Sequence, residues 1–319
     1  MSHLLEVQNL EVKFALRSGD LTAIDGASFT LDQGERLGIV GESGAGKSVT
    51  GFAIINLISK PGFISNGRIL FNGEEISAYP EHEMRKIRGN RISMIFQDPM
   101  MTLNPVLTIG TQMVETLQAH QNISKRDAKK IALEKLKKVH IPSPEKRLGQ
   151  YPHEFSGGMR QRIIIAISLL TDPAIIIADE PTTALDVTIQ AEIMDLLQEL
   201  CQTDRMGLIL ITHDLGVVSQ VTEKMAVMYA GRIIESGPTK TIVNDPAHPY
   251  TRGLIKSLPG VITPGEKLYQ IPGMMPNLTQ IPPGCAFNPR CLLKETLCET
   301  ERPRLKQTEK GIMAACHMI

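Results

Sequence analysis

The hydrophobic and polar positions of the chain repeat with two periods, which predict strands in some stretches and helices in others. Residues 4–14 alternate apolar and polar side chains, a pattern typical of an exposed edge strand, and residues 22–31 predict a second strand. Apolar runs predict four more strands, at 36–40, 92–96, 174–178 and 207–212. The runs at 174–178 and 207–212 suit strands that are buried on both faces of a parallel sheet.

Between the strands the apolar period becomes helical, most clearly over residues 98–172. Strands that alternate with helices predict a three-layer α/β core with a parallel sheet, preceded here by antiparallel N-terminal strands. We therefore expect three parts in the chain. They are a core of residues 1–97 and 173–244, a helical insertion at 98–172, and a Pro- and Gly-rich C-terminal appendage at 245–319.

The composition narrows the class of protein. Of the 319 residues, 42% are hydrophobic and 21% are charged, which is ordinary for a water-soluble globular chain. Lys and Arg together number 34, as do Asp and Glu, so the net charge does not favour binding to nucleic acid. No apolar run approaches the roughly 20 residues of a membrane-spanning helix, and the N-terminus lacks the apolar segment of a signal peptide. We therefore expect a cytoplasmic protein that meets a membrane only as a peripheral partner.

The strongest chemical signal is a glycine-rich segment between the strand at 36–40 and a helix predicted to reach Ile58. It matches the pattern G-x-x-x-x-G-K-[ST] in the strand-to-helix context that a phosphate-binding loop (P-loop) requires. Backbone N–H groups of such a loop surround phosphate oxygens, and the helix N-terminus adds positive potential. The expected ATP-binding residues are Gly41, Glu42, Ser43, Gly44, Ala45, Gly46, Lys47, Ser48 and Val49. Lys47 would neutralise the β- and γ-phosphates, and Ser48 would bind Mg²⁺.

Two carboxylates, Asp179 and Glu180, follow the apolar strand at 174–178. A carboxylate at the end of a buried strand beside a P-loop is placed to hold Mg²⁺, which is the role expected of Asp179. Glu180 would then polarise the attacking water as a general base. This pair is a weak signal alone and a strong one downstream of a P-loop.

A serine–glycine–glycine segment decides which class of P-loop enzyme this is. Ser156-Gly157-Gly158-Met159 resembles the signature Leu-Ser-Gly-Gly-Gln of ABC ATPases, with departures only at Phe155 and Met159. The resemblance implies that the Ser-Gly-Gly core touches the γ-phosphate of an ATP molecule bound to an opposite subunit. A helix that starts at Ser156 suits this role, because its free N–H groups and dipole favour an anion.

Further residues match other ABC elements. Gln97 resembles the glutamine that senses Mg²⁺ and the attacking water and couples to the membrane partner. Ala184-Leu185-Asp186 resembles the D-loop, and Asp186 is also placed to cap a helix. His213 resembles the histidine that contacts the γ-phosphate. Phe14 occupies the place of the aromatic residue that stacks on adenine, with an ordinary strand residue as the alternative.

Several stretches resemble one ABC family, the ATPases of oligopeptide, dipeptide and nickel importers. They are Phe96-Gln97-Asp98-Pro99-Met100, Asn104-Pro105, the segment from Ala178 to Asp186, His248-Pro249-Tyr250-Thr251, and Ile271-Pro272-Gly273 leading into Gly284-Cys285. The resemblance covers essentially the whole chain. It implies the P-loop ABC cassette fold and an ATPase that drives the uptake of di- or oligopeptides, with nickel, metal chelates or other small solutes as alternative cargo. A soluble ABC ATPase without a transport role is the competing class.

The same resemblance implies the partners. An ABC ATPase completes its active sites only as a dimer, here with a different sister chain or, alternatively, with a second copy. Two membrane permeases and an extracytoplasmic binding protein would complete the importer, on the cytoplasmic face of the inner membrane. No nucleic acid is expected among the partners.

Four of the five cysteines, Cys285, Cys291, Cys298 and Cys316, lie in the C-terminal appendage. In a reducing compartment such clustering favours a metal or metal cluster over disulfides. Zinc sites prefer pairs spaced by two to four residues, which this appendage lacks. The family resemblance implies a [4Fe–4S] cluster, with zinc and unligated thiols as alternatives. Cys201 lies in a helical pattern and is expected to be a buried apolar residue.

Overall fold

The computed structural model describes residues 3–98, 102–183, 185–258 and 269–319. The chain divides into two compact units. The first comprises Met1–Ala78 and Leu210–Ile319, and the second is Tyr79–Ile209. The three-part boundaries expected from the sequence remain a prediction. Within the described residues, no helix is long and apolar enough to cross a lipid bilayer.

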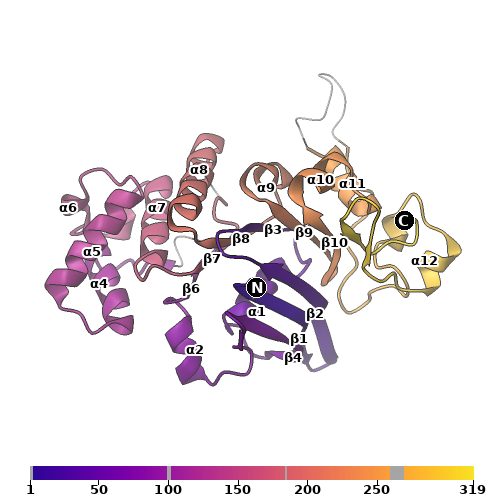
Figure 1. Cartoon of the computed structure of the whole chain (residues 1–319), viewed down its shortest axis with the longest axis horizontal. Coiled ribbons are helices and arrows are strands. Elements are labelled where there is room, and N and C mark those ends of the chain that lie inside the picture. The colour runs from indigo at the N-terminus through magenta and orange to yellow at the C-terminus, as the bar shows by residue number, and fades with distance from the viewer. Residues whose placement is uncertain (1–2, 99–101, 184, 259–268) are drawn as a thin grey trace. The chain divides into compact units, whose positions relative to one another are not determined.

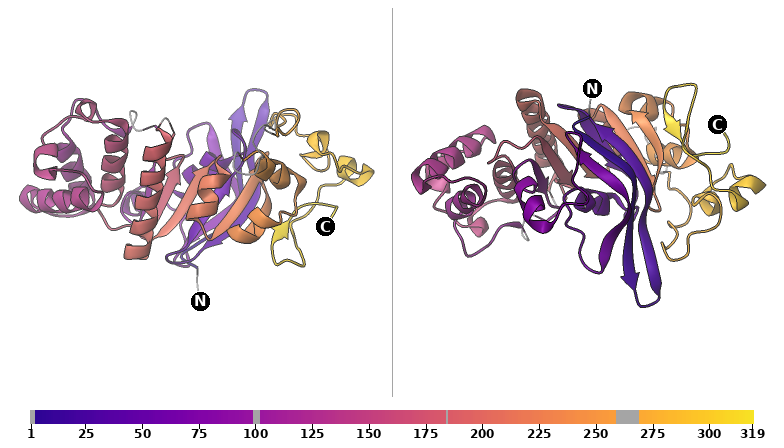
Figure 2. Two further views of the ribbon diagram at one scale, coloured as in Figure 1. Left: turned by 90° about the horizontal axis from the view of Figure 1, so that it is seen from above. Right: turned by 60° about the horizontal axis from the view of Figure 1, so that its bottom comes forward.

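The first unit contains a four-stranded antiparallel sheet in the order β2-β1-β4-β5 (Figure 1). Its strands are β1 (Leu5–Leu16), β2 (Gly19–Leu31), β4 (Gly62–Phe71) and β5 (Glu74–Glu75). The prediction that residues 4–14 form an exposed edge strand is wrong. Strand β1 pairs on both sides, with β2 and with β4. Its alternation reflects one buried face, which includes Val7, Leu10 and Val12. Figure 2 shows these long strands twisting side by side.

The first unit also holds strands of a second sheet that carries the P-loop. In this sheet β3 (Arg36–Val40) is parallel to β9 (Lys224–Tyr229), which forms an antiparallel hairpin with β10 (Arg232–Pro238). The hairpin turns at Ala230 and Gly231, which both have positive φ angles, as a two-residue turn requires. Strand β10 then pairs with β12 (Met313–Ala314), and β12 with β11 (Lys306–Gln307). The C-terminal residues therefore extend the sheet that the core begins.

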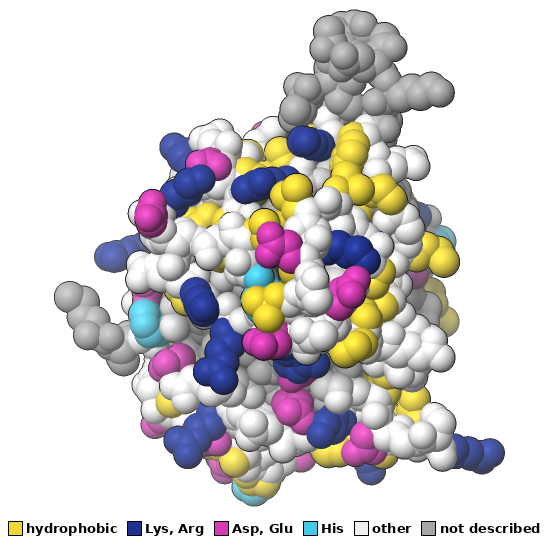
Figure 3. Space-filling model, turned by 90° about the vertical axis from the view of Figure 1, so that its right-hand side faces the viewer, with side chains coloured by type: hydrophobic (Ala, Val, Ile, Leu, Met, Phe, Trp, Pro, Cys, Tyr) yellow, Lys and Arg dark blue, Asp and Glu magenta, His cyan; other side chains and the backbone are white. Residues whose placement is uncertain are grey.

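The first unit also contains short helices. They are α1 (Lys47–Ile54), α9 (Leu215–Val221), α10 (Thr239–Asn244), α11 (Pro249–Lys256) and α12 (Thr296–Thr300), with a 3-10 turn η3 (Asn288–Arg290). Helix α1 ends four residues before the Ile58 that the sequence predicted, because the chain turns at Ile55 and Asn56, where Asn56 has φ 50°. The face of the C-terminal region mixes apolar side chains with both signs of charge (Figure 3).

The second unit is mainly helical, as the sequence predicted. Its elements are α2 (Glu81–Ile87), β6 (Ile92–Ile95), α4 (Ile109–His120), α5 (Lys125–Lys138), α6 (Pro144–Arg147), η1 (Pro152–Glu154), α7 (Gly157–Ser168), β7 (Ile175–Asp179) and α8 (Val187–Asp204). Strand β8 (Gly207–Thr212) crosses the division between the units. Strands β6 and β7 are parallel neighbours, and every residue of β7 is buried. Parallel pairing places the carboxyl ends of both strands at one edge.

Candidate functional site

The P-loop connects β3 to α1 in the first unit, and its backbone depends on glycine. Gly44 and Gly46 have φ angles of 82° and 101°, which side-chain-bearing residues rarely adopt. A Cβ atom at Gly46 would lie 2.9 Å from the carbonyl oxygen of Ala23. Gly46 is also the N-cap of α1 and provides no side-chain acceptor there. The first N–H groups of α1 therefore depend on a partner outside the helix side chains, and a phosphate is suited to that position.

Lys47, at the start of α1, is 5% exposed. Its Nζ donates to the carbonyl oxygens of Gly41, at 2.9 Å, and Glu42, at 3.0 Å. These bonds compensate a buried ammonium group, which would otherwise be costly. The lysine is thereby held against the first residues of the loop.

Phe14 and His213 also lie in the first unit. Phe14 is half-buried on β1, and a Cβ atom at Gly62 of β4 would lie 2.7 Å from the ring carbon Cε1 of Phe14. His213 is exposed directly after β8. The following Asp214 caps α9 by accepting from the N–H groups of Gly216, at 2.7 Å, and Val217, at 3.2 Å. The end of the strand and the start of the next helix thus fix the position of the histidine backbone.

In the second unit the structure brings Gln97 and Glu180 together. Because β6 and β7 are parallel, with Ile95 opposite Ala178, the residues that follow them lie at the same edge. Gln97 Nε2 donates to Glu180 Oε2 at 3.0 Å. Thr183 Oγ1 donates to the same oxygen at 3.1 Å, a contact that the sequence reading missed.

The backbone of these catalytic candidates is also distinctive. Asp179 is the last residue of β7 and is 2% exposed, whereas Glu180 has a positive φ of 45°. A non-glycine residue in this region carries strain of about 1 kcal/mol or more, which is found most often at functional sites. The carboxylate of Glu180 is therefore held by its backbone and by two side-chain donors at once.

The serine–glycine–glycine segment begins α7 as the sequence predicted. Ser156 is the N-cap, and its hydroxyl accepts from the N–H of Met159 at 3.4 Å. A Cβ atom at Gly158 would lie 2.7 Å from Ile189 Cγ2 in α8, so a glycine is needed for this close approach. Asp186 caps α8 by accepting from the N–H of Ile189 at 3.0 Å. Ala184 of the predicted D-loop lies outside the described residues, as do Pro99 and Met100 of the segment after Gln97.

The predicted ATP- and Mg²⁺-site residues thus divide between the two units. The P-loop, Phe14 and His213 belong to the first, and the remaining ATP- and Mg²⁺-site candidates, Gln97, Ser156, Gly157, Gly158, Asp179, Glu180 and Asp186, belong to the second. Within the second unit, Gln97 and Glu180 are in direct contact.

The four C-terminal cysteines also come together, in the first unit. Cys285, Cys291, Cys298 and Cys316 line one small cavity, with His248 and Phe287 among its other walls. All five cysteines of the chain are free thiols, and Cys298 is the most buried of the four, at 6% exposure. The backbone supports the grouping, because the N–H of Cys285 donates to the carbonyl oxygen of Cys298 at 2.8 Å.

Three of these sulfur atoms share a backbone arrangement. The N–H two residues further along bonds to the thiol in each case, from Phe287 to Cys285, from Leu293 to Cys291 and from Met318 to Cys316. The Met318 N to Cys316 Sγ distance is 3.4 Å. N–H groups directed at sulfur stabilise thiolates and are a feature of iron–sulfur ligation.

Burial acts in the opposite direction on the same thiols. It raises the pKa of Cys285 to about 11, and it raises the pKa of Cys291 and Cys316 as well. Among the described residues, no group of three or more His, Cys, Asp or Glu side chains is arranged so that it could hold a metal ion. A tetrahedral zinc site needs sulfur atoms about 3.8 Å apart, given a Zn–S bond of about 2.3 Å.

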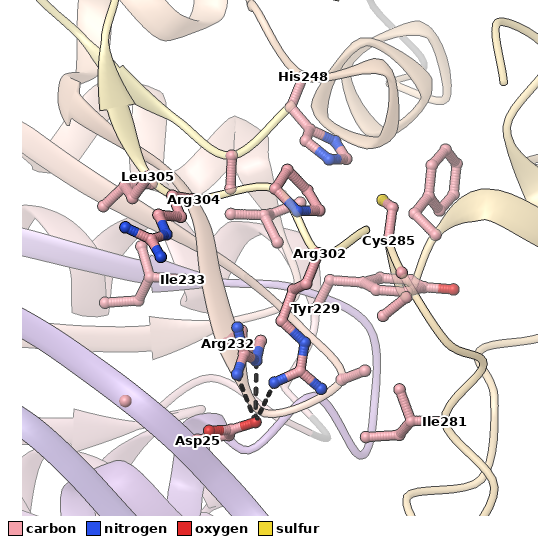
Figure 4. Close-up of a pocket in the computed structure, with 18 of the residues that line it drawn as sticks. Asp25, Tyr229, Arg232, Ile233, His248, Ile281, Cys285, Arg302, Arg304 and Leu305 are labelled. Atoms are coloured by element: carbon pink, nitrogen blue, oxygen red, sulfur yellow. Dashed lines mark hydrogen bonds and ion pairs between the residues drawn. The ribbon is translucent and has the colours of Figure 1, made fainter. Parts of the chain in front are cut away.

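A pocket of about 570 Å³ adjoins the cysteine cavity and shares His248, Cys285 and Phe287 with it. Figure 4 shows this pocket, with His248 and Cys285 labelled. Asp25 of β2 lies on its wall. Oδ2 of Asp25 accepts from Arg232 at 2.9 and 2.6 Å and from Arg302 at 3.2 Å. These bonds connect the N-terminal sheet, β10 and the C-terminal region at one carboxylate.

Comparison with protein families gives two matches. Residues 24–183 match the ABC transporter family, and residues 234–298 match the family described as oligopeptide/dipeptide transporter, C-terminal region. The second match contains three of the four clustered cysteines, Cys285, Cys291 and Cys298.

Individual relatives match over most of their length. The oligopeptide transport ATP-binding protein OppD of Escherichia coli is 48% identical over 98% of this chain and 92% of its own. OppD of Bacillus subtilis is 53% identical over 90% of this chain and 81% of its own. The dipeptide transport ATP-binding protein DppD of Bacillus subtilis is 50% identical over 95% of this chain and 91% of its own.

Solved structures show the same fold. The dimeric bacterial ABC transporter cassette MJ0796 covers 74% of this chain and 98% of its own at 27% identity, with a TM-score of 0.66. The cassette cbiO1 of Clostridium perfringens covers 77% of this chain and 92% of its own at 28% identity, with a TM-score of 0.65.

Proposed function

Because this chain belongs to the ABC transporter family of ATPases and has the ABC cassette fold, we propose that it is the ATP-hydrolysing subunit of a peptide importer. The observation that carries the proposal is 48% identity to OppD of Escherichia coli over 98% of the chain, including the oligopeptide/dipeptide C-terminal region. That region supports peptide cargo over nickel, metal chelates or other small solutes. A soluble ABC ATPase without a transport role has no comparable support.

The residues of the chain take the following parts in hydrolysis. The P-loop N–H groups and Lys47 bind the phosphates, and Phe14 stacks on adenine. Mg²⁺, when bound by Ser48, Asp179 and Gln97, supplies positive charge against the phosphate oxygens. Glu180, held by Gln97 and Thr183, accepts a proton from the attacking water. His213 contacts the γ-phosphate, where charge develops in the transition state.

The active site is completed by a second subunit. Ser156, Gly157 and Gly158 contact the γ-phosphate held by the partner, with the N-terminus of α7 directed at the anion. Asp186 belongs to the D-loop at the same dimer interface. We propose a sister ATPase as the partner, with a homodimer as the alternative. Two permeases and an extracytoplasmic binding protein complete the importer, and the chain works on the cytoplasmic face of the inner membrane.

The substitution Glu180→Gln tests the enzymatic assignment. It removes the proton acceptor and keeps the size of the side chain, so ATP turnover should fall at least about 100-fold while ATP binding persists and the closed dimer accumulates. Turnover is measured by phosphate release, and dimerisation by size-exclusion chromatography with ATP. Glu199→Gln, an exposed position on α8, is the matched control and should turn over normally. Normal turnover in Glu180→Gln would contradict the assignment.

For the cysteine cavity we propose a [4Fe–4S] cluster held by Cys285, Cys291, Cys298 and Cys316. The donor set supports it, with four thiols on one cavity and N–H groups directed at three of the sulfurs. When bound, the cluster supplies a structural crosslink to a loop-rich segment with few core residues.

Anaerobic purification followed by iron, sulfide and zinc analysis and visible absorbance tests the cluster. About four irons per chain are expected in the full-length protein, and each of the four Cys→Ser variants should lose most of them. The matched control is Cys201→Ser, a buried cysteine outside the cavity, which should keep its iron. One zinc per chain without iron would reject the cluster, and metal-free protein would favour unligated thiols.

A further inference from the structure

Arg290, in the cysteine-bearing C-terminal region, reaches the P-loop. Its side chain is 5% exposed, and Nη1 lies 3.0 and 3.1 Å from the two carboxylate oxygens of Glu42, the second residue of the loop. The same guanidinium donates to Tyr229 Oη at 3.3 Å and, through Nε, to the carbonyl oxygen of Pro272 at 2.8 Å. Every contact lies within one compact unit.

Glu42 is held from a second direction by another residue of the C-terminal half. Its backbone N–H donates to Tyr250 Oη at 2.9 Å, and Tyr250 itself is fully buried. The ring of Tyr250 packs against Tyr229 at 4.7 Å and against Phe287 at 5.5 Å between centroids. Both the side chain and the backbone of Glu42 are thus fixed by residues far along the sequence.

The position of Arg290 depends on the backbone between Cys285 and Cys291. Arg290 ends η3 and directly precedes Cys291. The N–H of Asn288 donates to the carbonyl oxygen of Cys285 at 2.9 Å, and the N–H of Cys291 donates to that of Asn288 at 3.2 Å. The backbone between two cavity cysteines therefore sets where the guanidinium lies.

Glu42 places a negative charge in a loop whose N–H groups and lysine are arranged for phosphate. An uncompensated carboxylate there would repel the nucleotide, and it would do so strongly because the site is partly shielded from water. Arg290 cancels this charge and fixes the side chain that carries it. Breaking a largely buried pair by removing one partner leaves the other charge unpaired.

We propose that Arg290 is a positioning residue for ATP binding, through which the cysteine-bearing C-terminal region neutralises Glu42 and holds the first residues of the P-loop. This role does not require a particular occupant of the cysteine cavity. It assigns to the C-terminal region a part in the nucleotide site, in addition to any part in assembly. ATP affinity should accordingly depend on Arg290 more than turnover by bound ATP does.

The test measures ATP affinity of the full-length chain by titration with a fluorescent ATP analogue and competition with ATP. Arg290→Met should weaken binding about tenfold, an effect that shrinks as salt is raised because it is electrostatic. Arg290→Lys keeps the charge without the paired geometry and should fall between Arg290→Met and the unchanged chain. Arg304→Met, an exposed arginine of the same region, is the matched control and should bind as the unchanged chain does.

The double variant Arg290→Met/Glu42→Gln separates the proposed role from general loss of structure. Removing the orphaned carboxylate should restore most of the lost affinity, whereas structural damage would make the double variant bind no better than Arg290→Met. If Arg290→Met does not fold, Arg290→Lys must still show weakened binding. Unchanged affinity in a folded Arg290→Met, or no recovery in the double variant, overturns the proposal.

Discussion

The P-loop and the cysteine cavity lie in one compact unit and are built in opposite ways. The P-loop is made of consecutive residues, and its shape follows from local backbone conformations at Gly44 and Gly46. The cavity collects residues from Cys285 to Cys316, with His248 and Phe287 among its walls. A local motif is therefore specified by its own residues, whereas the cavity exists only while the surrounding segments are packed.

The two sites also treat their polar groups differently. The P-loop satisfies Lys47 with its own carbonyl oxygens, in a glycine-rich backbone of the kind that suits a substrate that binds and leaves. The cavity directs N–H groups inward at sulfur and buries the thiols, which suits a ligand that remains bound. The ion pair between Arg290 and Glu42 connects the cysteine-bearing region to the P-loop.

The local character of the P-loop is tested most strongly by Gly46→Ala. The new Cβ atom would meet the carbonyl oxygen of Ala23 at 2.9 Å, in a backbone conformation that alanine rarely adopts. The loop must shift, so we expect ATP affinity to fall at least about 100-fold, or about 3 kcal/mol. Nucleotide titration measures the loss.

Gly73→Ala is the control for backbone strain alone. Gly73 has a similar φ of 82°, but a Cβ atom there meets nothing within 4 Å. This variant should lose about 1 kcal/mol of unfolding free energy and keep its ATP affinity. Equal losses of affinity in the two variants would show that strain, and not the shape of the loop, explains the effect.

The features that could be predicted from the sequence are those that local conformation determines. The glycine pattern, the buried strands β7 and β8, and the caps Ser156 and Asp186 were predicted from neighbouring residues, since local conformation determines them. The interior position of β1 was missed, because its partner β4 has a weak strand pattern interrupted by Ser65, Asn66 and Gly67. Helices α2 and α9 have only seven residues each, too few for a clear period.

The contacts between distant segments could not be predicted from the sequence. Nothing local marks Arg290 as the partner of Glu42, 248 positions away, or Thr183 as a second donor to Glu180. The segment from His248 to Thr251 was singled out by resemblance alone, and the structure supplies the reason for Tyr250, whose hydroxyl accepts from the P-loop. Such roles depend on tertiary packing, which periodicity and spacing do not encode.

The dependence of the cysteine cavity on packing is tested by Cys298→Ser, compared with Cys201→Ser. Both replace a buried thiol with a hydroxyl, at 6% and 1% exposure respectively. At Cys298 the change also removes a member of the four-thiol set, so we expect a loss of about 2–3 kcal/mol in unfolding free energy. At Cys201, in α8, about 1 kcal/mol is expected. Urea denaturation under anaerobic conditions measures both, and equal losses would mean that the cavity is not a cooperative site.

The smallest expected effect concerns the carboxylate that joins the C-terminal region to the N-terminal sheet. Asp25→Asn removes the charge that Arg232 and Arg302 share (Figure 4). The side chain of Asp25 is 29% exposed. A partly exposed pair of this kind contributes modestly, so the loss of unfolding free energy should be about 1 kcal/mol. ATP affinity should stay within about twofold, because Arg290 still holds Glu42.

Glu83→Gln is the matched control, since Glu83 pairs with Lys86 on an exposed helix face and should show no measurable change. A large loss of ATP affinity in Asp25→Asn would mean that the C-terminal region reaches the P-loop through the whole interface and not through Arg290 and Tyr250. A loss confined to stability would restrict the connection to those two residues. The P-loop would then be connected to the C-terminal region only through the contacts of Arg290 and Tyr250 with Glu42.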